Sequence, residues 1–97
     1  MLVILPPAQY DHAPIRPVPE IRMDWAEVDG YCREHGIVAP SRLTGYRLTA
    51  CTVRSGTWFT IILPNDGDVS ADDIDRLRRH EDGHVNGWPA DHPDGRI

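Results

Sequence analysis

The stretch VSADDIDRLRRHEDGHVNGWP, residues 69 to 89, constrains the fold more than any other part of the chain, because it signals both ends of one helix. Ser70 can accept hydrogen bonds from the amides of the first turn, and Asp73 occupies the third helical position, as in a capping box. At the other end, the Gly-Trp-Pro sequence stops the helix, since glycine tolerates a left-handed backbone and proline cannot extend a helix. We therefore predict a helix over residues 70 to 86.

The last two turns of this helix carry the sequence HEDGH, in which His80 and His84 flank Glu81. Residues four apart stand one above the other on a helix, so the two imidazoles can point at a common zinc ion ~2.0–2.1 Å from each nitrogen. Glu81 lies close enough to accept a proton from a metal-bound water. This group faces the core, because the apolar side of the helix is predicted to comprise Ile74, Leu77, Glu81, His84, Val85 and Trp88.

A third metal ligand is expected from the segment after the helix. The turn at Gly87 and Pro89 can bring His92 back over the metal, so we predict His92 as the third ligand. Other donors remain open at this position, namely Asp91, Asp94, His12 and His35.

This motif resembles that of the zincin metallopeptidases, and more narrowly the metzincin-type signature HExxHxxGxxH, which is matched by His80, Glu81, His84 and Gly87. It is also similar to an RHExGHxxGWP segment of small bacterial and phage proteins. The resemblance implies a zinc-dependent peptidase with Glu81 as general base, acting on a peptide or protein substrate. It also implies a motif helix under a sheet whose edge strand pairs with the substrate, and by that analogy residues 57 to 64 are the expected edge strand.

Three features depart from the metzincin pattern. His92 follows His84 by eight positions, whereas the signature has six, and no methionine follows the site. Asp82 occupies a position that is often apolar in related motifs, and we expect its side chain to be exposed.

The remainder of the chain predicts an N-terminal arm, a second helix and a β-hairpin. Prolines dominate residues 1 to 20, so we expect an extended arm that wraps the domain, with a short strand at residues 2 to 5. Capping signals predict a helix over residues 24 to 35. Residues 46 to 53 and 57 to 64 favour β-strands joined by a Ser-Gly turn. Together these elements predict one minimal zincin-like α+β domain, with a small mixed or antiparallel sheet, one packing helix and one motif helix.

Composition limits the function and the location of the protein. A chain of 97 residues supports one modest core, and a net charge of -5 argues against nucleic-acid binding. The two cysteines, Cys32 and Cys51, are too few for a disulfide scaffold, so we expect reduced thiols. The chain start lacks the features of a secretion signal, and no stretch reaches the ~20 apolar residues of a membrane helix. We therefore expect a cytoplasmic protein without a membrane-spanning helix.

Several other side chains are expected to have structural roles. Trp25, Trp58 and Trp88 are expected in the core, although Trp88 could instead line a substrate cleft. His35 suits the negative end of its helix dipole, and His12 is expected to be solvated.

Peptide hydrolysis also needs a group that stabilises the oxyanion. The sequence nominates this group only by residue type, as Tyr10, Tyr31 or Tyr46. The basic cluster of Arg76, Arg78 and Arg79 is expected to be a solvated helix face paired with the aspartates one turn earlier. The main alternative to a peptidase is a zinc-stabilised module that binds another protein, with the metal bracing a small core.

Overall fold

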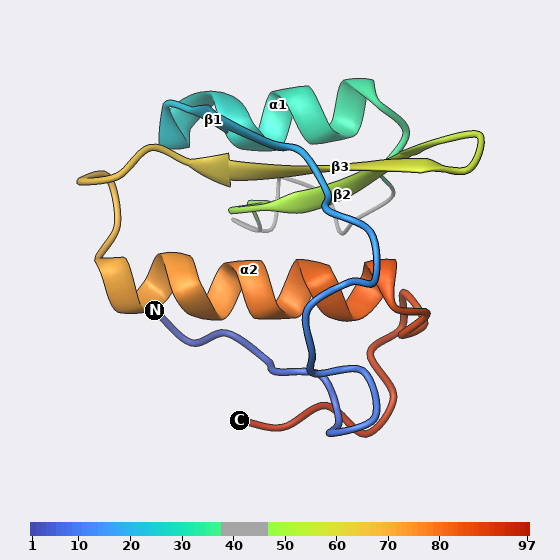
Figure 1. Cartoon of the computed structure of the whole chain (residues 1–97). Coiled ribbons are helices and arrows are strands. Elements are labelled where there is room, and N and C mark those ends of the chain that lie inside the picture. Colours follow the sequence, from blue (N-terminus) through green and yellow to red (C-terminus); the bar gives the residue numbers. More distant parts are fainter. Residues whose placement is uncertain (38–46) are drawn as a thin grey trace.

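The computed structural model describes residues 1 to 37 and 47 to 97, and these residues form the expected α+β fold (Figure 1). One helix lies on each face of a mixed sheet, which among the described residues has three strands in the order β1-β3-β2. The elements are β1 (Glu20–Met23), α1 (Trp25–Glu34), β2 (Cys51–Ser55), β3 (Trp58–Pro64) and α2 (Ala71–Val85).

Strand β3 is the centre of the sheet, and the expectation of an edge strand at residues 57 to 64 is therefore wrong. It pairs in parallel with β1 and antiparallel with β2. The strand β1, which the sequence did not predict, occupies the side that was expected to be free. Strand β2 lies at the edge of the sheet instead.

The alternation of side chains along β3 divides the core between the two faces. Ile62 packs with Val28 of α1, while Ile61 and Leu63 pack with Leu77 of α2. A disulfide between Cys32 and Cys51 crosses the α1 face, so the expectation of reduced thiols is wrong.

The two helices begin as predicted, but only one of the predicted side-chain caps forms. Ser70 accepts a hydrogen bond from the Asp73 amide at 3.1 Å, as expected for the start of α2. The Asp24 side chain makes no cap at the start of α1 and accepts a hydrogen bond from the Asn65 side chain instead. Backbone geometry suffices there, because the Asp24 carbonyl accepts the Glu27 amide at 2.8 Å.

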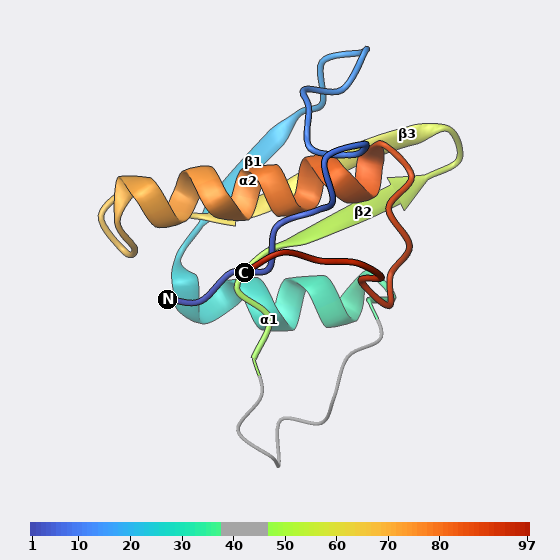
Figure 2. The same cartoon turned by 90° about the horizontal axis from the view of Figure 1, so that it is seen from below.

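The N-terminal arm contains no helix, as expected, but it is not extended throughout, because residues 8 to 10 form a turn closed by the hydrogen bond from the Tyr10 amide to the Pro7 carbonyl. The arm lies against α2 and the C-terminal segment (Figure 2). Residues 2 to 5 do not form the expected strand, because only Leu5 makes a bridge, to Arg96. The arm is held by ion pairs that the sequence did not indicate, from Arg78 to Glu20 and from Arg79 to Asp11. These two arginines therefore do not pair with the preceding aspartates.

Among the other expectations for single residues, some are confirmed and some are wrong. Nη1 of Arg76 lies 3.8 Å from Oδ1 of Asp73, as expected. Trp88 is buried at 2% exposure, whereas Trp25 and Trp58 are 38% and 68% exposed and do not belong to the core. No helix within the described ranges is both long and apolar enough to cross a bilayer.

Candidate metal centre

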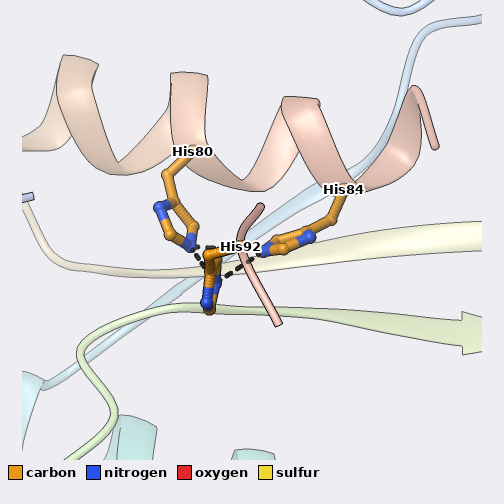
Figure 3. A group of neighbouring side chains, drawn as sticks. All are labelled: His80, His84 and His92. Carbon is orange, nitrogen blue, oxygen red and sulfur yellow. Dashed lines mark hydrogen bonds between the residues drawn. The ribbon is translucent and has the colours of Figure 1, made fainter. Parts of the chain in front are cut away.

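Helix α2 places two imidazoles one turn apart on the side that faces the sheet. The Nε2 atoms of His80 and His84 are 3.2 Å apart. Figure 3 shows both rings leaving the same face of α2 and pointing toward one point. The spacing of the motif therefore produces the geometry that the sequence predicts.

The end of α2 brings in the third ring. Gly87 has φ +108°, and the amides of Gly87 and Trp88 donate back to the carbonyls of His84 and Gly83. This double hydrogen bond is a Schellman motif, which stops the helix and reverses the chain. His92 follows in a left-handed conformation, φ 59°, with its Nε2 3.1 Å from the Nε2 of each of the other two histidines.

Backbone carbonyls fix the tautomers of the two helical histidines. Nδ1 of His80 lies 2.5 Å from the Ile4 carbonyl oxygen, and Nδ1 of His84 lies 2.9 Å from that of Trp88. A carbonyl can only accept a hydrogen bond, so each Nδ1 carries the proton and each Nε2 presents its lone pair to the centre. Such outer contacts orient imidazole ligands around metals.

The three nitrogens match the requirements of a metal ion. Two unprotonated nitrogens at 3.2 Å repel each other unless a cation or a proton lies between them. Three ligands at ~2.0–2.1 Å from a tetrahedral ion are separated by about 3.3–3.4 Å, close to the observed 3.1–3.2 Å. His80, His84 and His92 therefore could hold a metal ion.

Burial favours the neutral imidazoles that metal binding needs. It lowers the pKa of His80, against the opposing effect of the hydrogen bond to Ile4. Burial also lowers the pKa of His92, and the neighbouring His80 and His84 lower it further.

The other donors considered from the sequence are not part of this group. Asp91 and Asp94 are exposed. His12 is exposed and contacts the Ala13 carbonyl, and His35 contacts the Tyr31 carbonyl at the end of α1. The position of His35 agrees with its expected helix-end role.

Glu81 is buried beside the histidines rather than among them. Its Oε2 lies 3.9 Å from Nε2 of His80, and its Oε1 accepts a hydrogen bond of 2.9 Å from the Thr52 hydroxyl. Burial raises the pKa of Glu81 to about 7, opposed by the nearby His84 and by the Thr52 hydrogen bond. A carboxyl group with a pKa in this range can both accept and release a proton near neutral pH.

The expectation that Asp82 is exposed is wrong. Its side chain is half-buried, and burial raises its pKa to about 6, with a further contribution from the charge of Glu20. Glu20 at the start of β1 pairs with Arg78 on α2 and thereby lies near enough to Asp82 for its charge to act on it.

A cavity of about 780 Å³ contains the three histidines and Glu81. Its walls come from the end of α2, from the residues leading into and along β2, and from Met1 to Ile4. Trp88 also lines it, with its ring stacked on His84 at 4.9 Å between centroids, so Trp88 is both a core residue and part of the cavity wall.

The tyrosines nominated from the sequence do not contribute to this cavity as far as the structure describes them. Tyr10 and Tyr31 are absent from its lining, and Tyr31 stacks on His35 instead. Tyr46 lies outside the described residues.

Two contributors to the site were missed by sequence reasoning. Thr52 is 29 positions from Glu81, and the Ile4 carbonyl is 76 positions from His80. No local pattern marks either contact. The only available signal for Thr52 was the alternation of side chains along a strand, which places Thr52 on the same face as the residues two positions before and after it.

Comparisons with protein-family models, curated proteins and solved structures found no match to this chain. The chemistry of the site must therefore be inferred from its own atoms.

Proposed function

We propose that the protein is a zinc-dependent hydrolase of peptide or related amide bonds. The observation that carries this proposal is the convergence of three imidazole Nε2 atoms within 3.1–3.2 Å, with the buried carboxyl group of Glu81 next to them in an open cavity. Three protein ligands and a free coordination position distinguish catalytic zinc sites from structural ones, which use four protein ligands. No fourth protein ligand joins the group within the described ranges.

Zinc is the metal we propose because the donors are three neutral imidazoles at a near-tetrahedral spacing. A bound zinc ion would supply a Lewis acid and lower the pKa of a coordinated water to about 7. His80, His84 and His92 would hold it, oriented by the carbonyls of Ile4 and Trp88.

Glu81 is the proposed general base. Its carboxyl group would accept the proton of the attacking water and pass it to the nitrogen that leaves the cleaved amide. Its hydrogen bond to Thr52 holds one oxygen, so the other is free to face the reacting atoms on the His80 side.

Metal analysis tests the site, and a single conservative substitution tests the reaction. We expect about one zinc per chain in the purified protein, with loss of zinc in H80A, H84A and H92A. We expect E81Q to keep its zinc and its fold but to lose cleavage of a peptide library followed by mass spectrometry. Full metal content in all three alanine variants would contradict the proposed site.

The second candidate is a zinc-stabilised module that binds another protein. The observation in its favour is that the metal ligands join separate parts of the chain, since His80 contacts the arm at Ile4 and His92 lies in the C-terminal segment. This function predicts that H80A unfolds the domain while neither the wild type nor E81Q cleaves any peptide.

A further inference from the structure

An apolar wall borders the cavity of the candidate metal centre. Met1, Leu2 and Ile4 line this cavity and are 55%, 73% and 39% exposed. Single exposed apolar side chains are common on protein surfaces and need no explanation. A contiguous group of them in a concave site is typical of a place where a ligand binds. These three share one cavity with the histidines and Glu81.

Other apolar side chains also line the cavity. Leu48, Ala50 and Phe59 come from the residues before β2 and from β3, and Leu77 comes from α2. Apart from Glu81, the one charged side chain among the described lining residues is Arg47. Its guanidinium is held over the Trp25 ring, 4.4 Å from the centroid.

The wall is anchored to the rest of the fold. Leu5 and Arg96 exchange two backbone hydrogen bonds of 2.7 and 2.8 Å, and Ile4 packs so closely on Gly95 that a side chain there would collide with it. The Ile4 carbonyl accepts the hydrogen bond of His80. Ile4, the innermost residue of this wall, is therefore held at a fixed position relative to His80.

From these observations we propose that the wall formed by Met1, Leu2 and Ile4 selects substrates with a bulky aliphatic or aromatic side chain next to the amide bond that is cleaved. This inference rests on the proposed hydrolase function and names its substrate class. An acidic side chain would lose hydration on this wall, where the Met1 ammonium group already pairs with Asp73 and the Arg47 guanidinium is held over Trp25. An apolar side chain would instead gain from removal of apolar surface from water. Burial of one leucine-sized side chain corresponds to about 10- to 100-fold in binding.

The experiment compares two synthetic peptides that differ only in one residue, leucine or glutamate. This residue stands beside a bond cleaved in the peptide library or, if none is cleaved, at the centre of an otherwise alanine peptide. For the zinc-loaded wild type we expect kcat/KM to be about 10- to 100-fold higher for the leucine peptide. L2D should reduce this preference at least several-fold, and L2N should reduce it less. I15D is the matched control, because Ile15 is 99% exposed and does not line the cavity.

A binding measurement separates this inference from the proposed reaction. Labelled forms of both peptides are titrated against zinc-loaded E81Q, with and without L2D, and binding is followed by fluorescence anisotropy. Tighter binding of the leucine peptide that is lost in L2D supports the wall even if no peptide is ever cleaved. Two results would overturn the inference and leave the hydrolase proposal standing. One is cleavage of both peptides without preference. The other is a preference that L2D leaves intact while circular dichroism shows the fold unchanged.

Discussion

At the scale of single residues, the Thr52 hydroxyl determines how the Glu81 carboxyl group is held. Valine has the same shape as threonine but would leave Oε1 of Glu81 buried without its 2.9 Å hydrogen bond. We expect T52V to lower the free energy of unfolding by about 1–3 kcal/mol, the cost of an unsatisfied buried polar group. Under the proposed function, T52V should also lower turnover. Urea unfolding and peptide cleavage measure the two effects.

T52S is the matched control for this prediction, because serine keeps the hydroxyl. We expect T52S to retain most of the turnover and to lose only the small contribution of one methyl group to stability, about 1 kcal/mol. Equal behaviour of T52V and T52S would show that the hydroxyl has no role in holding Glu81.

His92 is the proposed metal ligand for which the sequence gave least support, and a comparison with its neighbour Asp91 tests the proposal. H92A removes one of three donors, so we expect zinc affinity to fall by more than the about 10–100-fold that loss of an outer contact costs. D91A should leave the affinity unchanged, because Asp91 is exposed and outside the histidine group. Competition with a chromophoric chelator measures both. If D91A weakens zinc binding and H92A does not, the third ligand is misassigned.

The three histidines could be predicted because their positions depend on local geometry. The helical period fixes the relation of His80 to His84, and the glycine and proline after the helix return the chain toward it. The contacts of Thr52 and the Ile4 carbonyl could not be predicted, since they depend on which strand and which arm pack against α2. The environment of Asp82 was missed for a similar reason, because Glu20, whose charge helps to raise its pKa, comes from β1 and is 62 positions away in the sequence.

At the scale of elements, the contact between α2 and the arm depends on a glycine within the motif. A Cβ atom at Gly83 would lie 2.7 Å from Cγ of Pro6 and 2.8 Å from its Cβ. Alanine favours a helix by about 1 kcal/mol over glycine, but a rigid proline ring cannot yield to such a contact. We expect G83A to lower stability by about 1–3 kcal/mol and to weaken zinc binding, because Pro6 is two residues from the Ile4 carbonyl that orients His80.

The double variant P6G/G83A provides the control for this clash. Glycine at position 6 removes both the Cγ and the Cβ atom that the alanine at position 83 would meet, so the double variant should be more stable than G83A alone. Thermal unfolding of the four proteins in this cycle measures the coupling. Additive effects of the two substitutions would contradict the proposed contact.

The same elements explain which parts of the fold the sequence could predict. Helix α2 begins at Ser70 and ends at Gly87 through contacts within a few residues, so its bounds follow from local signals. Strand β1 has four residues and exists because Glu20 meets Ile61 of β3, a partner 41 positions away. Because of that pairing, β3 lies at the centre of the sheet and not at the edge, where it was expected. No local sequence pattern could indicate this.

The ion pairs that tie the arm to α2 should make its attachment sensitive to acid. Hydrogen bonds from Arg79 hold the pKa of Asp11 below its ordinary value of 3.8, and those from Arg78 hold the pKa of Glu20 below 4.5. The folded protein thus binds fewer protons than the unfolded chain, so this stabilisation is complete above these ordinary values and is lost as the pH falls through the lowered ones.

We therefore expect D11N/E20Q to be less stable than the wild type near neutral pH, by about 1 kcal/mol because the arginines are partly exposed. The difference should shrink toward zero as the pH falls below the ordinary pKa values of 3.8 and 4.5 and through the lowered ones. Urea unfolding near neutral pH and at acid pH measures it. D66N is the control and should change stability little, since Asp66 pairs with Arg22 but is 87% exposed. A difference in unfolding free energy between D11N/E20Q and the wild type that does not change with pH would contradict the role assigned to these two ion pairs.

At the scale of the whole molecule, the disulfide between Cys32 and Cys51 joins α1 to the edge strand β2 beside the cavity. Cysteine number alone could not predict it, because pairing depends on the fold that brings the two residues together across the α1 face. Disulfides persist mainly in oxidising compartments. The bond therefore removes the cysteine-based support for a cytoplasmic location, which stays an untested prediction.

The disulfide also leads to a prediction about stability. It closes a loop between residues 19 positions apart, and a loop of this size contributes about 3 kcal/mol by restricting the unfolded chain. We expect the free energy of unfolding of C32A/C51A, and of the wild type in a strong reductant, to be lower by a similar amount. Urea unfolding measures this difference. Because Cys32 and Cys51 are 0% and 4% exposed, reduction should require partial unfolding and proceed slowly in the native protein. Intact mass before and after alkylation measures the bond directly, and two alkylated thiols in the native, unreduced protein would show that it does not form.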